Sequence, residues 1–180
     1  QTCALPIFEI FAREIKKNAW IEDHLSQGEQ FGQYWATGEF SYRSEYCATD
    51  GLVLVGDAFS FLDPVFSSGV YLALRSGELA AETINQIFKD DGKFTAENFV
   101  DYGKDFRNAV ETMRKIVYAF YDEKFSFGKL IRKDMNLREP LTDCLIGNID
   151  DKDFSNLFTA MSEFADLPDP VNYGDVLRTA

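Results

Sequence analysis

Apolar side chains recur every three or four positions between Phe8 and Leu25, with charged residues between them. This spacing matches the 3.6-residue period of a helix that buries one face. We therefore expect an amphipathic helix over residues 8–26, with a break near Asn18 and an end at the turn residues 26–28.

The period changes to two in the next segment, residues 31–47. Aromatic Phe40, Tyr42 and Tyr46 alternate there with polar side chains, which predicts a strand with one aromatic face. After a Thr-Asp-Gly turn, Leu52–Val55 is an unbroken apolar run. Such a run is typical of a strand buried on both faces, as in a sheet covered by helices.

Helical spacing dominates the chain from there to Ala165. It predicts four helices, over residues 68–88, about 95–123, 137–146 and 152–165. Ala73, Gly77 and Ala80 place small side chains on one side of the first of these helices, so another backbone can approach that side closely. The second carries an apolar stripe that we interpret as core: Phe99, Phe106, Val110, Met113, Val117 and Phe120. From Asp166 onward, polar residues and two prolines predict a poorly ordered tail.

The first seven residues, QTCALPI, fit none of these elements. They do not begin with Met, and the string resembles one translation frame of a common sequencing adapter. We expect residues 1–7 to be non-native and the native sequence to start near Phe8, so that the chain is the C-terminal part of a longer protein. The alternative is an ordinary loop or strand end.

Composition narrows the function classes. Apolar residues make up 46% of the 180 positions, enough for the core of one domain or slightly more. The formal net charge of −12 argues against a protein that binds nucleic-acid phosphates or an anionic membrane surface. No apolar run reaches the roughly 18 residues of a membrane span, and no signal-peptide pattern is present. We therefore expect a cytoplasmic protein.

Three cysteines and one histidine limit the chemistry that the chain can carry. Cys3, Cys47 and Cys144 show no C-x-x-C spacing, so neither a disulfide framework nor a zinc site is expected. A single histidine, His24, supplies neither a histidine-based metal cluster nor a Ser-His-Asp triad. We interpret His24 as a surface or helix-capping residue, and Cys47 and Cys144 as small buried apolar side chains.

The segment from Leu52 to Leu79 concentrates residues suited to bind a ligand. Gly56 and Asp57 follow the apolar run at its carboxyl end, where ligands of open α/β sheets gather. Glycine permits a close approach of ligand or backbone, and a carboxylate accepts hydrogen bonds from sugar-like hydroxyls. The simpler alternative is that Asp57 only caps a turn.

A predicted helix N-terminus follows in the same segment. An Asp-Pro pair at residues 63–64 predicts an extended turn, after which two serines and a glycine open the long helix. The unpaired amides of Ser68, Gly69 and Val70 would point out of the helix end, which attracts anions and electron-rich oxygens. Strand, loop and helix end together predict a site for a partly anionic ligand; the alternative is that Ser67 or Ser68 only caps the helix.

Residues 56–74, GDAFSFLDPVFSSGVYLAL, resemble the second flavin-binding segment of FAD-dependent monooxygenase-type oxidoreductases, in which Gly-Asp-Ala precedes a Pro-containing loop and a helix. The string DPVFSSGV at residues 63–70 is more similar to the flavin-dependent halogenase family than to the hydroxylases. Weaker similarities lie at residues 41–44 and 118–122. The resemblance extends over most of residues 8–165, but its specificity lies in residues 56–74.

This resemblance implies an α/β fold: a partial FAD-binding domain of the Rossmann-like, hydroxylase type that lacks its N-terminal dinucleotide-binding unit, followed by a mostly α-helical C-terminal region. Residues 8–92 would be the C-terminal part of the FAD and substrate domain, 93–165 the helical region and 166–180 a flexible tail. The chain holds neither the G-x-G-x-x-G turn nor the W-x-W-x-I-P segment of the family, because Trp20 and Trp35 stand apart.

The resemblance also implies roles for individual residues. Asp57 would hold the ribityl chain or diphosphate of FAD, while the Pro64 loop and the Gly69 and Val70 amides would lie against the pyrimidine side of the flavin ring. Chloride would bind the Ser68 and Gly69 amides. The implied cofactor-binding set is Gly56, Asp57, Pro64, Ser68, Gly69 and Val70. The family's catalytic lysine has no match here and is expected upstream, and Asp63 is expected to point away from the halide.

By this resemblance the parent protein would use reduced FAD, oxygen and chloride to halogenate an aromatic small molecule or a carrier-protein-bound substrate, with a flavin reductase supplying the reduced flavin. We expect the isolated chain to be inactive and to bind FAD weakly, because half of the cofactor's cradle is missing.

Two alternatives stay open. A FAD-dependent hydroxylase or an isoprenoid-chain flavin reductase would differ by lacking halide dependence and the upstream lysine. A non-catalytic, stand-alone binding module would fold cooperatively by itself. Arg43, Arg75 and the basic cluster Lys129–Lys133 are candidate contacts for a partner or for the adenine end of FAD, although a solvated face is the simpler interpretation.

Overall fold

The chain divides by its internal contacts into two units, residues 1–40 and 41–180. The computed structural model describes residues 6–35, 38, 40–90, 92–149 and 152–178. Most of the segment predicted to be non-native, including Cys3, therefore lies outside the described residues.

The first unit contains two short helices, α1 (Ile7–Lys17) and α2 (Ala19–Leu25). Asn18 separates them with an extended backbone, and its side chain accepts a hydrogen bond of 3.2 Å from the Ile21 amide. Asn18 thus ends the first helix and caps the second. Because the second helix begins at the next residue, the apolar spacing continues across the break. The predicted break near Asn18 is confirmed.

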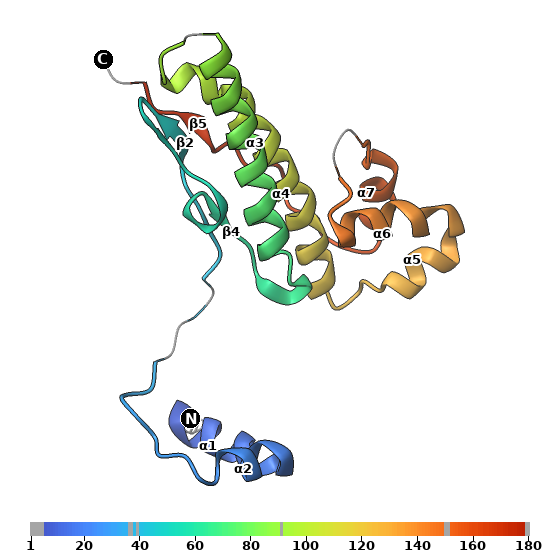
Figure 1. Cartoon of the computed structure of the whole chain (residues 1–180). Helices are drawn as coiled ribbons and strands as arrows, with labels where there is room; N and C mark the ends of the chain where they lie inside the picture. Colours follow the sequence, from blue (N-terminus) through green and yellow to red (C-terminus); the bar gives the residue numbers. More distant parts are fainter. Residues whose placement is uncertain (1–5, 36–37, 39, 91, 150–151, 179–180) are drawn as a thin grey trace. The chain divides into compact units, whose positions relative to one another are not determined.

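Two long helices form the centre of the second unit, α3 (Gly69–Lys89) and α4 (Val100–Tyr121). They run side by side in opposite directions, and the short helix η3 (Ala96–Phe99) leads into α4 (Figure 1). The predicted helices at 68–88 and 95–123 are thus confirmed. The apolar stripe of α4 is buried up to Val117, but Phe120 at its end is 45% exposed.

Small sheets pack beside these helices. β1 (Tyr42–Arg43) pairs antiparallel with β4 (Ser60–Phe61). β2 (Tyr46–Thr49) pairs antiparallel with β3 (Leu52–Val53) and parallel with β5 (Asp175–Val176), giving the order β3-β2-β5. The fold is therefore mixed α/β and mostly helical.

The strands differ from the sequence prediction in two respects. The strand expected over residues 31–47 is divided, because Ser44 turns its amide to the Phe59 carbonyl at 2.8 Å. The apolar run at 52–55 forms an edge strand of two residues, and Leu52 is 55% exposed. The prediction of a strand buried on both faces is therefore wrong. A short apolar run also fits an edge strand, in which only the middle residues, here Val53 and Leu54, are partly buried.

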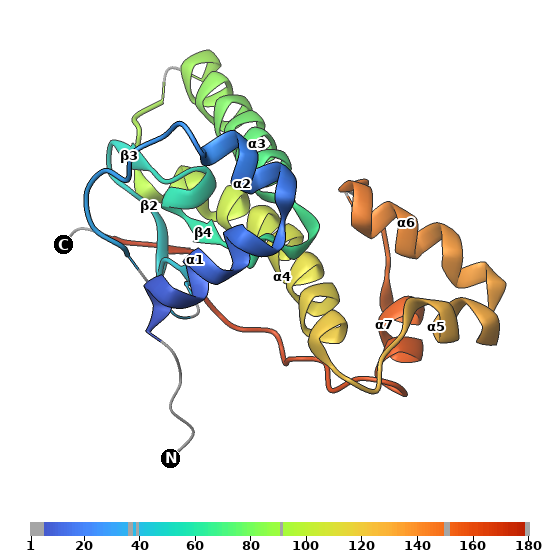
Figure 2. The ribbon, with the colours of Figure 1, turned by 90° about the horizontal axis from the view of Figure 1, so that it is seen from below.

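A helical region follows α4. Its elements are α5 (Phe127–Lys133), η4 (Met135–Leu137), α6 (Arg138–Ile146) and α7 (Ser155–Met161). Figure 2 shows α5, α6 and α7 gathered beyond the last turn of α4. The predicted helices at 137–146 and 152–165 correspond to α6 and to a shorter α7.

The segment expected to be a poorly ordered tail, residues 166–180, is different in the structure. It contains β5, and Tyr173 is only 5% exposed. Gly174 adopts a left-handed φ of +70°, and a Cβ on Gly103 of α4 would lie 2.3 Å from the Gly174 carbonyl oxygen. Gly103 and Gly174 thus allow the backbone of the C-terminal segment to contact the backbone of α4. The sequence pattern does not predict this contact.

Candidate functional site

Gly56 lies directly against α3. It opens the short helix η1 (Gly56–Ala58) with a left-handed φ of +54°, and its amide donates a hydrogen bond of 2.8 Å to Ser76 Oγ. A Cβ on Gly56 would stand 3.2 Å from the Ala73 Cβ. The side of α3 that carries small residues was predicted to allow close approach of another backbone, and the backbone at Gly56 approaches it here.

Asp57 comes next and is exposed. Within the part of the chain that the structure describes, its carboxylate takes part in no hydrogen bond or ion pair, and it does not cap η1. Only its backbone oxygen is engaged, by the Tyr42 hydroxyl. The Asp57 carboxylate is therefore available to a ligand, as the sequence suggested.

Asp63 anchors the loop between η1 and α3. Its Oδ1 accepts hydrogen bonds from the Val65 amide and from the Tyr121 hydroxyl, both at 3.0 Å. The bond to the carboxylate raises the pKa of the Tyr121 phenol. These partners bind the Asp63 carboxylate to the loop and to α4. Pro64, exposed, begins the short helix η2 (Pro64–Phe66).

Aromatic rings fix the other end of this loop. Phe66 packs edge-on against Phe120 and Phe127, with centroid distances of 5.4 and 6.2 Å. Ser67 then takes a left-handed backbone with φ +55°, uncommon for a residue with a side chain. The Pro64–Ser67 loop is thus held from both sides before the chain enters α3.

The N-terminus of α3 is open. Ser68 occupies the cap position but its side chain makes no capping hydrogen bond, so the simple capping alternative for Ser68 does not hold. Among the described residues, none accepts a hydrogen bond from the amides of Ser68, Gly69 or Val70. A Cβ on Gly69 would meet nothing within 4 Å, and Val70 is 73% exposed. The free amides and the helix dipole favour an anion here.

These features share one side of α3. Gly56 touches Ala73, and Gly69 lies four positions, about one helical turn, before Ala73 on the same face of α3. Pro64 belongs to the loop that joins them. The structure therefore brings the six predicted residues to the first two turns of α3.

The two described thiols are not accessible to a ligand. Cys47 and Cys144 are buried, as expected, and burial raises the pKa of the first thiol to about 11 and of the second to about 12. His24 is exposed near the end of α2. Across the described residues, no three histidine, cysteine, aspartate or glutamate side chains group as metal ligands, and no helix is long and apolar enough to cross a membrane.

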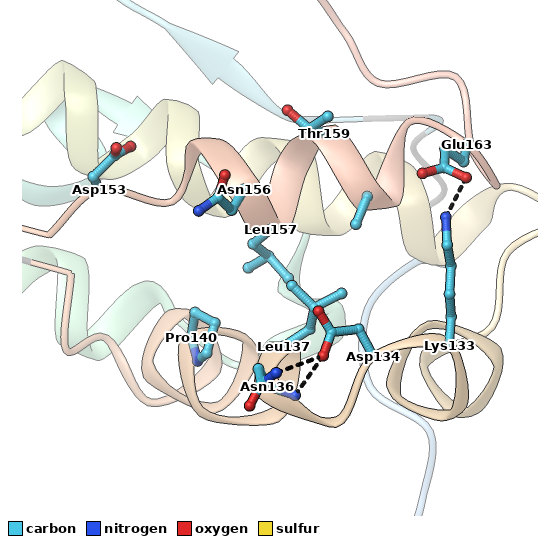
Figure 3. A pocket seen from close by; sticks show the side chains of 11 residues that line it. Lys133, Asp134, Asn136, Leu137, Pro140, Asp153, Asn156, Leu157, Thr159 and Glu163 are labelled. Atoms are coloured by element: carbon cyan, nitrogen blue, oxygen red, sulfur yellow. Dashed lines mark hydrogen bonds and ion pairs between the residues drawn. The ribbon is translucent and has the colours of Figure 1, made fainter.

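A cavity of about 470 Å³ lies elsewhere, between the α5–α6 segment and α7 (Figure 3). Lys133 forms an ion pair with Glu163 at its side, and Asp134 accepts hydrogen bonds from Asn136. None of its lining residues belongs to the Gly56–Val70 segment. This cavity is separate from the candidate site.

Three residues support the site through contacts that the sequence did not predict, although Tyr42 and Tyr121 lie in segments noted above for their similarity to the family. Tyr42, Ser76 and Tyr121 contact Asp57, Gly56 and Asp63, respectively. Each lies at least 15 positions from its partner along the chain. No local pattern could have indicated these pairs.

Comparisons with known proteins identify sequences similar to this chain. A family model described as tryptophan halogenase matches residues 36–147. A 1H-pyrrole-2-carbonyl-[peptidyl-carrier protein] chlorinase of Pseudomonas fluorescens is 28% identical over 141 residues, which are 78% of this chain and 31% of the relative. A tryptophan 2-halogenase of Chondromyces crocatus is 27% identical over 96% of this chain and 33% of its own length.

A solved structure is also similar, that of the flavin-dependent brominase Bmp2. It superimposes with a TM-score of 0.61 at 26% identity, over 86% of this chain and 37% of the brominase. The chain thus spans about a third of the length of these relatives. The family model covers more than half of the chain and includes the whole Gly56–Val70 segment, so this chain belongs to the tryptophan halogenase family.

Proposed function

We propose that this chain is the C-terminal portion of a FAD-dependent halogenase that uses reduced flavin, oxygen and chloride to halogenate an aromatic small molecule or a carrier-bound substrate. The observation that carries the proposal is the open N-terminus of α3, with the free amides of Ser68, Gly69 and Val70. Membership of the halogenase family favours this function over a hydroxylase or an isoprenoid-chain reductase.

The residues around this helix end fit a flavin. The exposed Asp57 carboxylate suits the hydroxyls of the ribityl chain or a position beside the diphosphate. Pro64, Gly69 and Val70 suit the pyrimidine side of the ring, because the open space at Gly69 lets a flat ligand reach the backbone. FAD, when bound, supplies the reaction with oxygen that no side chain of this segment can provide. A separate flavin reductase would supply reduced FAD.

The chain's own groups have distinct tasks in this proposal. Ser68 and Gly69 donate amide hydrogens to the halide, and the α3 dipole stabilises negative charge beside it. Gly56 contributes space and not a donor, since its amide is already bound to Ser76. Asp63, whose Oδ1 is held by Val65 and Tyr121, leaves the helix end to the halide.

Bromide titration of the isotope-labelled chain tests the halide assignment directly. We expect amide shifts at Ser68, Gly69 and Val70 that saturate with sodium bromide and not with sodium gluconate. Gly69→Asp should abolish them, because its carboxylate would compete for the same amides while remaining favourable at a helix N-terminus. Gly69→Ala is the control, because its side chain accepts no hydrogen bond and a Cβ at this position meets nothing within 4 Å, and it should keep them. Non-saturating shifts in the unmodified chain would contradict the assignment.

A hybrid enzyme tests the larger function. Residues 41–178 would replace the matching third of the Pseudomonas chlorinase, with FAD, a flavin reductase and carrier-bound pyrrole supplied. We expect a chlorinated product whose formation requires chloride and is lost in the Gly69→Asp hybrid. A hybrid that folds and binds FAD but forms only hydroxylated product, or none, would refute the halogenase function of this segment.

A further inference from the structure

The carboxylate closest in sequence to the open N-terminus of α3 belongs to Asp63. Its Oδ1 accepts a hydrogen bond of 3.0 Å from Tyr121, the last residue of α4. Because α3 and α4 run side by side in opposite directions, the last turn of α4 lies beside the first turn of α3 (Figure 1). Phe66, at the end of η2, contacts Phe120 in that last turn. Asp63 and Gly69 therefore lie at the same end of this helix pair.

No cation neutralises the Asp63 carboxylate within the part of the chain that the structure describes. Its partners there are the Val65 amide and the Tyr121 hydroxyl, both on Oδ1. A carboxylate is itself a favourable ligand for a helix N-terminus. It also repels an external anion within a Debye length, about 10 Å in 0.1 M salt. Asp63 is thus the chain's own competitor for the amides at the start of α3.

The loop contains two helix starts, and Asp63 caps only the first. Its carboxylate accepts the Val65 amide at the start of η2. At the start of α3, by contrast, Ser68 makes no side-chain capping bond. Tyr121 reaches Asp63 from α4 and adds the second bond to the same oxygen. Without this hydroxyl, the Val65 amide alone would hold the carboxylate at η2.

We propose that Tyr121 is a positioning residue: it holds the Asp63 carboxylate at η2 and so keeps the N-terminus of α3 free for an external anion. This inference rests on the proposed function, in which that anion is the halide. It deepens that function, because halide affinity then depends on a hydroxyl that donates nothing to the halide. One such hydrogen bond shifts the equilibrium between two positions of a carboxylate by roughly threefold to tenfold.

Amide hydrogen exchange tests this role without any halide. In Tyr121→Phe, exchange should accelerate at Val65 and slow by roughly twofold or more at Gly69 and Val70, because the carboxylate leaves the first amide and bonds the others. A loop that merely loosened would exchange faster at all three. Adding Asp63→Ala to Tyr121→Phe should remove the slowing, since no carboxylate is left to move.

Bromide titration tests the consequence for the anion. The dissociation constant, followed at the Gly69 amide, should rise roughly twofold or more in Tyr121→Phe. In Asp63→Ala/Tyr121→Phe it should return to the value of the unmodified chain or below, although this variant has lost a further loop bond. Tyr118→Phe is the matched control, because it removes another exposed hydroxyl of α4 that is not bonded to Asp63. It should change neither the exchange rates nor the dissociation constant.

The outcomes separate this role from the halide assignment. An unchanged dissociation constant in Tyr121→Phe, or a rise that Asp63→Ala does not reverse, would overturn the positioning role, as would faster exchange at Gly69. An unmodified chain that binds no bromide would refute the halide assignment instead. The opposite changes in exchange at Val65 and Gly69 would still support the role of Tyr121, so failure of one proposal is distinguishable from failure of the other.

Discussion

The Tyr121 hydroxyl donates a hydrogen bond of 3.0 Å to Asp63 Oδ1 and so joins two positions 58 residues apart. Tyr121 is the last residue of α4, and Asp63 begins the loop that leads into α3. The same Asp63 oxygen caps that loop by accepting the Val65 amide. The end of one long helix therefore sets the conformation of the segment that opens the other.

Removing this bond should loosen the loop without unfolding the chain. In Tyr121→Phe we expect amide exchange at Val65 to accelerate by roughly tenfold, because the freed Asp63 carboxylate rotates away from it. Tyr34→Phe, which removes a tyrosine hydroxyl bond to Gln30 away from this loop's sequence, should leave Val65 unchanged. In Asp63→Asn the pKa of the Tyr121 phenol should fall toward its ordinary value, as ultraviolet titration can show. Unchanged amide exchange at Val65 in Tyr121→Phe would show that the bond between Tyr121 and Asp63 does not hold the loop.

The hydroxyl of Ser76 should contribute to the stability of the fold. Ser76→Ala leaves the Gly56 amide buried without an acceptor, which costs about 1–3 kcal/mol of unfolding free energy. Ser162→Ala, at an exposed helix-end hydroxyl, should cost far less. Urea unfolding of the two variants gives the comparison, and equal losses would show that the Gly56 amide finds another partner.

Gly147 allows α6 to end beneath the ring of Tyr71. A Cβ on Gly147 would lie 2.7 Å from that ring, and the residue has a left-handed φ of +80°. We expect Gly147→Ala to lower the unfolding free energy by about 1–3 kcal/mol. Gly77→Ala is the control, since a Cβ there meets nothing within 4 Å inside α3, and it should raise stability by about 0.5–1 kcal/mol. Thermal unfolding distinguishes the two signs.

The buried thiols predict an alkaline loss of stability. Burial raises the pKa of Cys47 to about 11 and of Cys144 to about 12, from 9.0 in the unfolded chain. Between pH 9 and pH 12 the unfolded chain has therefore lost thiol protons that the folded chain retains, so stability falls as pH rises through this window. The double variant Cys47→Ala/Cys144→Ala should flatten this part of the pH dependence.

Thiol labelling gives a second measurement of the same effect. In a Cys3→Ser background, folded chain at pH 8 should react with a thiol reagent at a small fraction of the rate of urea-unfolded chain. Rapid labelling of Cys47 or Cys144 in the folded chain would mean that these thiols are reached by solvent.

Local patterns predicted the long helices, the Asn18 break and the segment that forms the candidate site. They did not predict the C-terminal return, because its partners are remote. Glu111 and Arg114 of α4 form a buried ion pair, and the Arg114 guanidinium also donates to the Asp169 carbonyl at 2.6 Å. In the sequence, a Glu and an Arg three positions apart on a helix look the same whether they are exposed or buried. Only the position of the C-terminal segment shows that this ion pair is buried.

The strand predictions failed for a related reason. An apolar run of four residues has the same pattern at the edge of a sheet as at its centre, and only the neighbouring strands decide between them. Here β2 finds one neighbour within a few residues, β3, and the other, β5, at the far end of the chain.

That long-range pairing has a consequence for synthesis on the ribosome. Thr49 Oγ1 donates to the Leu177 carbonyl, 128 residues later, and β2 cannot complete its sheet until that segment is made. Translation adds roughly 5–20 residues per second. The edge of β2 and the ring of Phe59 therefore stay uncovered for on the order of ten seconds. During that interval the nascent chain offers an open strand to other chains and to chaperones. A translation pause between residues 61 and 173 should therefore increase aggregation.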